Sequence, residues 1–549
     1  MSTSGAWVDV IIQFNNNSAG SQLQGQLNGI ENMLMQFGQG NQNVQQQGQH
    51  GDKILHSINA LHLKIPSFLI PWLKANPAIK YISPDRPTTK FLDLTTAAVS
   101  ANVAWQSGWD GTGVGVAVID SGIALKHDLT AANGASRVVY SENFASGQTS
   151  ATDAYGHGTH VAGIIGSAGR DSTGLLFKRT FKGVAPNVNL INLRVLDPNG
   201  AGMEADVISA IQRAIDLKNV YNIRVINLSL GRPVFESYTL DPLCQAVEAA
   251  WKAGIVVVTA AGNFGRDNSM GTKGYGTIAS PGNDPYVITV GAMKTNGTPA
   301  TYDDTIASYS SKGPTLGDHV VKPDLVAPGN QVISLQAPNN TLALNYPRTL
   351  IPNALFELGN ILGKSPDYFM LSGTSMATPV VSGAAALLIQ QHPSLTPDQV
   401  KARLMKTALK PVTLYSTGTD AITFQTYNSQ ADIFTIGAGY LNIAAALANN
   451  DLATLPALSP VAVRNPVTHK TNILRGSGTW GDTILWGDGA VYGNIVFTHT
   501  ALFSLDDTLD VSVLWGDTVI WGQDDSVLWG DTVSGSSNLS ALSADDDDL

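Results

Sequence analysis

The 549-residue sequence contains one cysteine, Cys244, so it cannot form an internal disulfide. Cys244 lies in an apolar stretch with helical spacing, residues 242–254, where a thiol packs as a small apolar group. The chain also lacks an excess of positive charge, because 32 Lys and Arg stand against 43 Asp and Glu, giving a formal net charge of −11. Nucleic-acid binding proteins generally carry a basic surface, so we expect no nucleic-acid partner.

Long apolar runs are missing as well. No stretch reaches the roughly 18 consecutive apolar residues that predict a membrane span, so we expect none. The first five residues lack the basic and then apolar pattern of a signal peptide, and no such peptide is evident in this chain. What is present, 43% hydrophobic residues and 54 glycines, is typical of a folded chain rich in tight turns.

The composition changes along the chain and predicts three regions, 1–91, 92–450 and 451–549. In the first, residues 8–14 have the pattern of a strand, and a Gln- and Asn-rich stretch follows up to residue 50. Short apolar runs interrupted by prolines occupy residues 54–82. This region is predicted to be a small α+β unit with a loose polar insertion.

In the second region, short apolar strands alternate with amphipathic helices. Continuous apolar strands separated by helices indicate an α/β domain whose central, mainly parallel sheet is covered on both faces. The carboxyl ends of such strands lie along one edge, where α/β folds place their sites. Strands are predicted at 114–119, 188–195, 225–230, 255–261 and 287–292, with helices at 204–217, at 243–253 and from a Thr396 cap onward.

The third region carries a repeated Trp-Gly-Asp unit. Five of the ten tryptophans fall in it, and Trp with β-branched residues around a Gly-Asp turn predicts short hairpin strands. We therefore expect a β-rich repeat region, followed by a solvated acidic tail at 545–548. The repeats lie at 480–482, 486–488, 515–517, 521–523 and 529–531, where Gln523 replaces the Asp of the fourth.

Three segments contain residues with chemical potential, and each also has a structural interpretation. Asp120 ends a predicted strand and precedes Ser-Gly, as in many ordinary turns. His157 lies in the segment Gly-His-Gly-Thr-His-Val-Ala-Gly at 156–163, and its histidine pair could also bind a metal, although no acidic ligand accompanies it. Ser375 precedes a long apolar helix, where a serine is commonly only a cap.

Together the three segments favour nucleophilic catalysis. A hydroxyl needs an imidazole to take its proton, and the imidazole needs a carboxylate to fix its tautomer. The order Asp, His, Ser along the chain differs from that of the α/β-hydrolases, and Gly-Thr-Ser-Met-Ala at 373–377 does not match their Gly-x-Ser-x-Gly elbow. An α/β-hydrolase is therefore disfavoured.

The three segments resemble the signature segments of the subtilase family: Val-Ile-Asp-Ser-Gly at 118–122, His-Gly-Thr-His-Val-Ala-Gly at 157–163 and Gly-Thr-Ser-Met-Ala-Thr-Pro at 373–379. The resemblance extends over about residues 92–446 and implies the three-layer subtilisin-like α/β fold. It also implies a serine endopeptidase that forms an acyl-enzyme on Ser375, with His157 as general base and Asp120 orienting that base. Its partners would be protein or peptide substrates.

Two further segments match the family pattern. Ala-Ala-Gly-Asn at 260–263 resembles the segment that supplies the oxyanion-hole asparagine, so the resemblance assigns that role to Asn263. Leu-Ser-Leu-Gly at 228–231 resembles the edge strand that binds an extended substrate by β-augmentation. The substrate-binding residues implied are Leu228, Ser229, Leu230, Gly231, Ala260, Ala261 and Gly262. The small residues among them, Ala260 to Gly262 in particular, leave room for a large apolar P1 residue.

The N-terminal region resembles a subtilase propeptide at residues 76–85. The resemblance implies an intramolecular chaperone and inhibitor that is removed by autocleavage after Phe91, with residues 88–91 in the edge-strand groove of the precursor. It also implies a secreted or extracytoplasmic protein. An ordinary accessory domain remains an alternative interpretation of this region.

The chain departs from the family pattern in two places. Residues 166–182 do not match the calcium loop of the familiar secreted members, although Asp128 falls where a ligand carboxylate would lie. We therefore expect no required cofactor, no other metal site, and calcium only as an option. Residues 336–367 form an insertion before the serine segment, either a specificity loop or a tolerated surface loop.

Two other functional hypotheses remain open. In one, the protease domain is inactive and the Trp-Gly-Asp repeats bind a surface, a glycan or another copy of the chain. In the other, the repeats are a second removable extension or an export signal of a zymogen. The intact triad positions favour the enzyme over the first of these.

Overall fold

A computed structural model describes most of the first 464 residues and five short strands beyond them. The Trp-Gly-Asp units, the acidic tail and the polar insertion from residue 16 to residue 50 lie outside the described residues. The chain divides into two compact units, Met1–Thr89 and Lys90–Leu549. The described ranges are 7–15, 53–55, 60–84, 91–92, 94–360, 362–410, 413, 415–420, 423–464, 471–474, 491–492, 495–496, 502–503 and 538–541.

The first unit contains an antiparallel sheet in the order β2-β3-β1-β4 and a short helix, α3. Alternate residues of β1 (Val10, Ile12 and Phe14) are buried and pack with Leu63 and Ile65 of β3, as the period of two in a strand requires. The predicted α+β organisation of this region is thus observed. The elements are β1 (Trp7–Phe14), β2 (Lys53–Leu55), β3 (Ala60–Pro66), α3 (Ile70–Lys74) and β4 (Ile79–Pro84).

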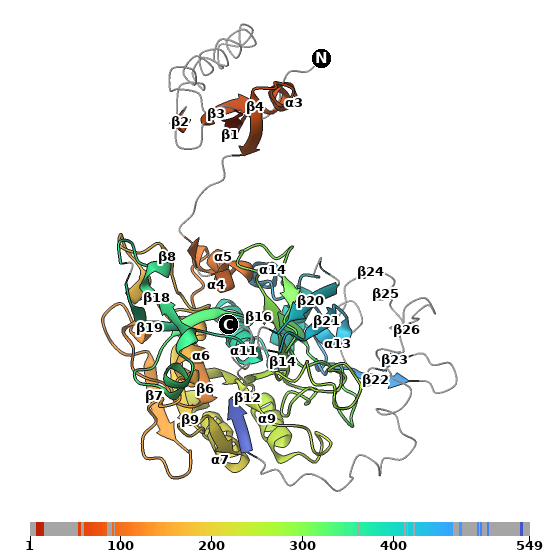
Figure 1. Cartoon of the computed structure of the whole chain (residues 1–549). Helices are drawn as coiled ribbons and strands as arrows, with labels where there is room; N and C mark the ends of the chain where they lie inside the picture. The colour runs from red at the N-terminus through yellow and green to blue at the C-terminus, as the bar shows by residue number, and fades with distance from the viewer. Residues whose placement is uncertain are drawn as a thin grey trace. The chain divides into compact units, whose positions relative to one another are not determined.

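The second unit is built on a sheet of strand order β15-β14-β13-β11-β6-β9-β7, with β16 paired to β14 (Figure 1). All of its pairs are parallel except β14 with β15. Every residue of β6 and β13 is buried, which explains their continuous apolar sequences. The strands are β6 (Gly115–Asp120), β7 (Val138–Asn143), β9 (Asn189–Arg194), β11 (Ile223–Leu228), β13 (Val256–Ala260), β14 (Ile288–Lys294), β15 (Thr305–Ile306) and β16 (Leu325–Pro328).

Helices cover both faces of this sheet. Helices α6 (His157–Gly166) and α11 (Thr374–Gln391) pack against each other and the sheet, and α7 (Glu204–Asp216) and α9 (Pro242–Lys252) form a second packed pair (Figure 1). Helix α11 is buried on all sides over its first sixteen residues, as its unbroken apolar sequence requires. The predicted three-layer α/β fold is confirmed. Helix α12 (Pro397–Lys406) begins with the expected Thr396 capping box.

The other elements form small sheets and short helices around this framework. The predicted insertion, 336–367, begins directly after β17 and extends into the first part of β19, and its Phe356 packs against Phe181 and Tyr368. The small sheets are β5-β8, β10-β27-β12, β17-β19-β18, β20-β21, β22-β23-β26 and β24-β25. Their strands are β5 (Phe91–Leu92), β8 (Arg179–Thr180), β10 (Ala201–Met203), β12 (Leu230–Gly231), β17 (Val332–Leu335), β18 (Leu350–Pro352), β19 (Lys364–Leu371), β20 (Tyr415–Thr419), β21 (Thr426–Gln430), β22 (Val461–Arg464), β23 (Thr471–Leu474), β24 (Val491–Tyr492), β25 (Ile495–Val496), β26 (Leu502–Phe503) and β27 (Asn538–Ala541). The short helices are α4 (Leu94–Ala98), α5 (Ala101–Gln106), α8 (Lys218–Tyr221), α10 (Thr341–Asn345), α13 (Ile433–Ile436) and α14 (Ile443–Ala448).

Candidate active site

Asp120 and His157 form a buried pair at the carboxyl edge of the sheet. Asp120 is the last residue of β6, and His157 is the first residue of α6. The Nδ1 atom of His157 lies 2.8 Å from Oδ1 of Asp120, and both side chains are fully buried. That oxygen also accepts the backbone N–H of Ser121 at 2.7 Å. The carboxylate can therefore fix the tautomer of the imidazole, with the proton on Nδ1 and a free lone pair on Nε2.

The glycines next to His157 let α6 approach β6 closely. A Cβ atom on Gly158 would lie 2.2 Å from the carbonyl oxygen of Gly122, so only glycine fits there. Gly156, just before the helix, has a φ of 106°, in the left-handed region that favours glycine. The Gly-His-Gly sequence is thus required for the close contact that brings the imidazole to the carboxylate.

A second buried carboxylate, Asp153, holds this region together. It accepts hydrogen bonds from the backbone N–H of Gly156 (2.7 Å) and from the N–H and hydroxyl of Thr159 (2.8 and 2.7 Å). It also accepts the hydroxyl of Ser121 at 2.9 Å. Burial raises the pKa of Asp153 above its ordinary value, although the donors oppose that shift. Sequence reasoning missed Asp153, because a lone Asp in a loop has no distinguishing pattern.

The second histidine of the segment, His160, faces away from this pair. Its Nε2 atom lies 3.0 Å from the carbonyl oxygen of Val332, and its ring packs edge-on against Phe369. Burial and the neighbouring His157 lower the pKa of His160 to about 3, so it is neutral at physiological pH. The two imidazoles therefore have separate partners, and within the described ranges no group of three or more His, Cys, Asp or Glu side chains could hold a metal.

Ser375 lies at the N-terminus of α11 and contacts Ser229. Its hydroxyl donates to the carbonyl oxygen of Ser229 at 3.0 Å, and the Ser229 hydroxyl donates to the carbonyl oxygen of Ser375 at 2.9 Å. Nε2 of His157 is buried and has no hydrogen-bond partner in the described part of the chain. A rotation of the Ser375 hydroxyl away from Ser229 is therefore needed before it can donate to the imidazole, as is common in sites without substrate.

A chain of buried hydrogen bonds holds the start of α11 beside β11. Ser382 donates to Oδ1 of Asn227 at 2.8 Å, and Nδ2 of Asn227 donates to the hydroxyl of Ser229 at 2.9 Å. Because Ser229 in turn donates to Ser375, one network runs from the middle of the helix to its first turn. It fixes the position of the nucleophile candidate relative to the sheet.

Asn263 lies beside the same helix terminus and is held there through its amide oxygen. Its Oδ1 accepts both the N–H and the hydroxyl of Thr374, at 2.9 and 3.0 Å. This orientation leaves Nδ2 buried and without a hydrogen-bond partner among the residues that the structure describes. A buried, unpartnered donor is costly unless it has a function. Next to the helix N-terminus it can stabilise a developing oxyanion.

The predicted edge-strand residues divide between two sheets. Leu228 ends β11 in the central sheet, whereas Leu230 and Gly231 form β12 in the small sheet β10-β27-β12. Ala260 ends β13, and the next two residues, Ala261 and Gly262, continue toward Asn263 as a buried segment. The carbonyl oxygen of Ala261 accepts the N–H of Ala279. The next residue, Ser280, exchanges backbone hydrogen bonds with Arg232, which directly follows β12. Ala279 and Ser280 thus connect the two predicted substrate-binding segments.

The predicted cleavage position, Phe91, lies elsewhere in this arrangement. Its backbone pairs with Arg179 in the two-stranded sheet of β5 and β8. Residues 85–90 lie outside the described residues. For autocleavage after Phe91, Phe91 has to leave β8 and enter the groove beside β12. The cleavage position therefore stays a prediction.

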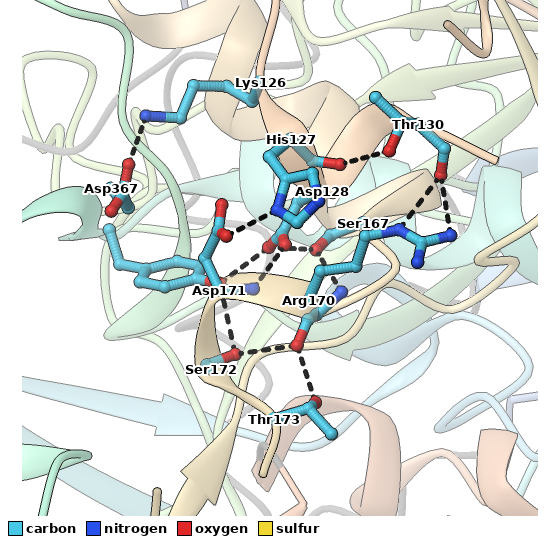
Figure 2. A network of polar contacts seen from close by, with 12 residues as sticks. Lys126, His127, Asp128, Thr130, Ser167, Arg170, Asp171, Ser172, Thr173 and Asp367 are labelled. Atoms are coloured by element: carbon cyan, nitrogen blue, oxygen red, sulfur yellow. Dashed lines mark hydrogen bonds and ion pairs between the residues drawn. The ribbon is translucent and has the colours of Figure 1, made fainter. Parts of the chain in front are cut away.

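Asp128, where the family pattern would place an optional calcium ligand, is surrounded by hydrogen-bond donors. Its carboxylate accepts the hydroxyls of Tyr368 (2.6 Å) and Ser167 (2.9 Å) and the backbone N–H of Asp171 (2.8 Å). Figure 2 shows this network, with the ion pair of Lys126 and Asp367 nearby. Burial raises the pKa of Asp128. Calcium requires a shell of oxygen acceptors, and these neighbours instead direct hydrogens at the carboxylate, so they do not fit a calcium site.

The comparisons with known proteins agree with this geometry. The sequence model of the subtilase family matches residues 111–439. Serine protease AprX of Bacillus subtilis (strain 168) is 39% identical over 361 residues, which are 64% of this chain and 74% of that protein. Subtilisin DY of Bacillus licheniformis is 37% identical over 311 residues, 56% of this chain and 89% of the relative.

Among solved structures, a cold adapted subtilisin-like serine proteinase is 30% identical to this chain, with a TM-score of 0.39. The match covers 55% of this chain and 84% of the chain in that structure. In the described residues, no helix is long and apolar enough to cross a membrane. The family match covers more than half of the 549 residues and includes Asp120, His157, Asn263 and Ser375. The chain belongs to the subtilase family and is a subtilisin-like serine endopeptidase, which acts on protein or peptide substrates.

Proposed function

We propose that Ser375, His157 and Asp120 hydrolyse peptide bonds in two acyl-transfer steps. The Ser375 hydroxyl attacks the substrate carbonyl while Nε2 of His157 takes its proton, and Asp120 stabilises the imidazolium that forms. His157 then gives the proton to the leaving amine. Water, activated by the same imidazole, releases the acyl group from Ser375.

The observation that carries this proposal is the convergence of three features at one edge of the sheet. They are the buried 2.8 Å contact of His157 with Asp120 and two buried atoms, Nε2 of His157 and Nδ2 of Asn263, that have no hydrogen-bond partner among the described residues. Nδ2 of Asn263 and the backbone N–H of Ser375 would hold the negative oxygen of the tetrahedral intermediate. These donors are fixed before the reaction, which is what makes such a site effective.

We assign residues 1–91 to a propeptide, 92–450 to the catalytic domain and 451–549 to a C-terminal extension. The separate hydrophobic core of Met1–Thr89 supports the first assignment, because a removable inhibitor must fold on its own. The protein is thus a zymogen, inhibited by its own propeptide until autocleavage after Phe91. Its resemblance to subtilisins supports a secreted or extracytoplasmic location.

The small residues Ala260, Ala261 and Gly262 support a preference for large apolar P1 residues, because they leave space beside the substrate strand. No cofactor takes part in these steps. The donors around Asp128 argue against the one calcium position that the family pattern suggested.

Processing and specificity are tested together. Intact mass and N-terminal sequencing of purified wild type should show loss of about the first 91 residues, whereas Ser375→Ala stays full length. In a series of peptides that differ only at P1, Phe and Leu should give the highest kcat/KM. A wild type that stays full length while hydrolysing peptides would refute the assignment as a zymogen. A preference for Lys or Asp at P1 would refute the proposed apolar P1 pocket.

A further inference from the structure

The small sheet next to the nucleophile has its middle strand from the far C-terminus of the chain. Strand β27 lies between β10 and β12 and is antiparallel to both (Figure 1, blue). Ser540 is opposite Ala201 on one side and Gly231 on the other. In this sheet, β10 and β12 pair with β27 and not with each other, so β27 fills a gap one strand wide.

The direction of β27 is that of a substrate. Gly231 is opposite Ser540, and Leu230 is opposite Ala541, so β27 runs toward Ser229. Ser229 is the residue whose carbonyl oxygen accepts the Ser375 hydroxyl at 3.0 Å. A peptide that binds with its acyl side in this groove must run the same way, because its scissile carbonyl has to reach Ser375.

The sequence of the tail also fits a protease groove. Residues 532–544 carry no charge, and the strand is followed by Leu542, a large apolar residue. Leu542 itself lies outside the described residues.

We infer that Asn538–Ala541 is an intramolecular ligand of the peptide-binding groove, which competes with peptide substrates. The proposal rests on the proposed function of this groove. Since the strand belongs to the same chain, its occupancy does not depend on protein concentration. Phe91 and Leu92 do not occupy this position, because they form β5, which pairs with β8. The C-terminal extension is thereby assigned a role as an inhibitory segment.

Occupancy can be tested by a disulfide, independently of catalysis. Ala201→Cys with Ser540→Cys places thiols on directly opposed residues, whose Cα separation in an antiparallel pair lies within the range for a disulfide. The full chain should carry Ser375→Ala so that it does not digest itself. The native Cys244 is fully buried and does not compete.

The matched control is Ala201→Cys with Ser534→Cys, which places the second thiol in the same tail but before β27. Tryptic mass mapping without reductant should find a link from position 201 to position 540 in most molecules, and little to position 534. Equal linking of both pairs, or none, would overturn the proposal.

Inhibition is tested with active enzyme. A chain that ends at Ser537 should have a KM for a peptide substrate at least about tenfold lower than the full chain, with kcat unchanged, because a tethered competitor raises only the apparent KM. Leu539→Pro with Ser540→Pro should reproduce this effect, since successive N–H groups of a strand point to opposite neighbours and proline removes both.

The control for the proline pair is Ser534→Pro with Gly535→Pro, which should behave as the full chain does. Identical KM values for all four chains would overturn the inhibitory role while leaving the peptidase intact. If no chain hydrolysed peptide, the proposed function would fail, but the disulfide experiment would still decide whether the groove is occupied.

Discussion

Replacing Asn263 by alanine tests the oxyanion assignment most sharply. The side chain has two halves with different roles: Oδ1 accepts from Thr374 at 2.9 and 3.0 Å, whereas Nδ2 is buried and unpartnered within the described residues. Removing one oxyanion donor from a related protease costs about 10²- to 10³-fold in kcat, or roughly 2.7 to 4 kcal/mol. We expect a loss in that range, with KM nearly unchanged, because the donor acts only when negative charge develops.

The stability effect of the same change should be small. Losing the acceptor for the Thr374 N–H costs about 1 kcal/mol. Asn283→Ala is a matched control, because Asn283 is fully buried and its Nδ2 also lacks a partner in the described part of the chain. Steady-state kinetics and urea unfolding of both variants separate the two effects. A kcat within tenfold of wild type for Asn263→Ala, or an equal loss for Asn283→Ala, would refute the assignment.

Three further predictions concern groups around the site and in the core. Asp153→Ala should lower kcat by about 10²-fold with KM little changed, because it removes the carboxylate that accepts four hydrogen bonds around His157. Asp153→Asn should restore part of the rate. Steady-state kinetics that show a pure KM effect would contradict this positioning role. Burial raises the pKa of Asp284 to about 7 from an ordinary 3.8, so the native state binds its proton more tightly than the unfolded state and loses stability as the pH rises from about 4 to 7. In a Ser375→Ala background, the free energy of unfolding of Asp284→Asn should therefore equal that of its parent at pH 4 and exceed it by up to about 4 kcal/mol at pH 8, as measured by urea unfolding. Equal differences at both pH values would count against the raised pKa of Asp284. Dialysis against EDTA should leave the Tm and peptide hydrolysis unchanged, since the Asp128 carboxylate already accepts three hydrogen bonds. A loss of activity that only added calcium reverses would contradict this and show a required calcium site elsewhere.

Local sequence patterns were sufficient to predict the framework and the three catalytic candidates. The apolar run that ends at Asp120, the glycines around His157 and the buried helix after Ser375 each follow from the packing of one element. The structure places all three at the carboxyl edge of the sheet or at helix termini beside it, as parallel sheets generally do.

The contacts that depend on distant segments could not be predicted in this way. The hydrogen bond from Ser375 to Ser229 joins residues 146 positions apart, and the Asp128 carboxylate is satisfied by Tyr368, 240 positions away. The pairing of β27 with β10 and β12 rests on four residues that have no strand pattern of their own. Such short strands are specified by their neighbours rather than by local propensity.

The most direct test of the account is peptide hydrolysis by Ser375→Ala beside Ser372→Ala. Both serines are buried in the same segment, but only Ser375 lies at the start of α11 beside Asn263. Wild type and the two variants should each be expressed from the whole 549-residue sequence and purified in the same way, with intact mass after treatment with a fluorophosphonate probe as a second readout. We predict that wild type and Ser372→Ala hydrolyse peptide and take up one probe molecule, whereas Ser375→Ala does neither. Hydrolysis and labelling that persist in Ser375→Ala would contradict the central claim.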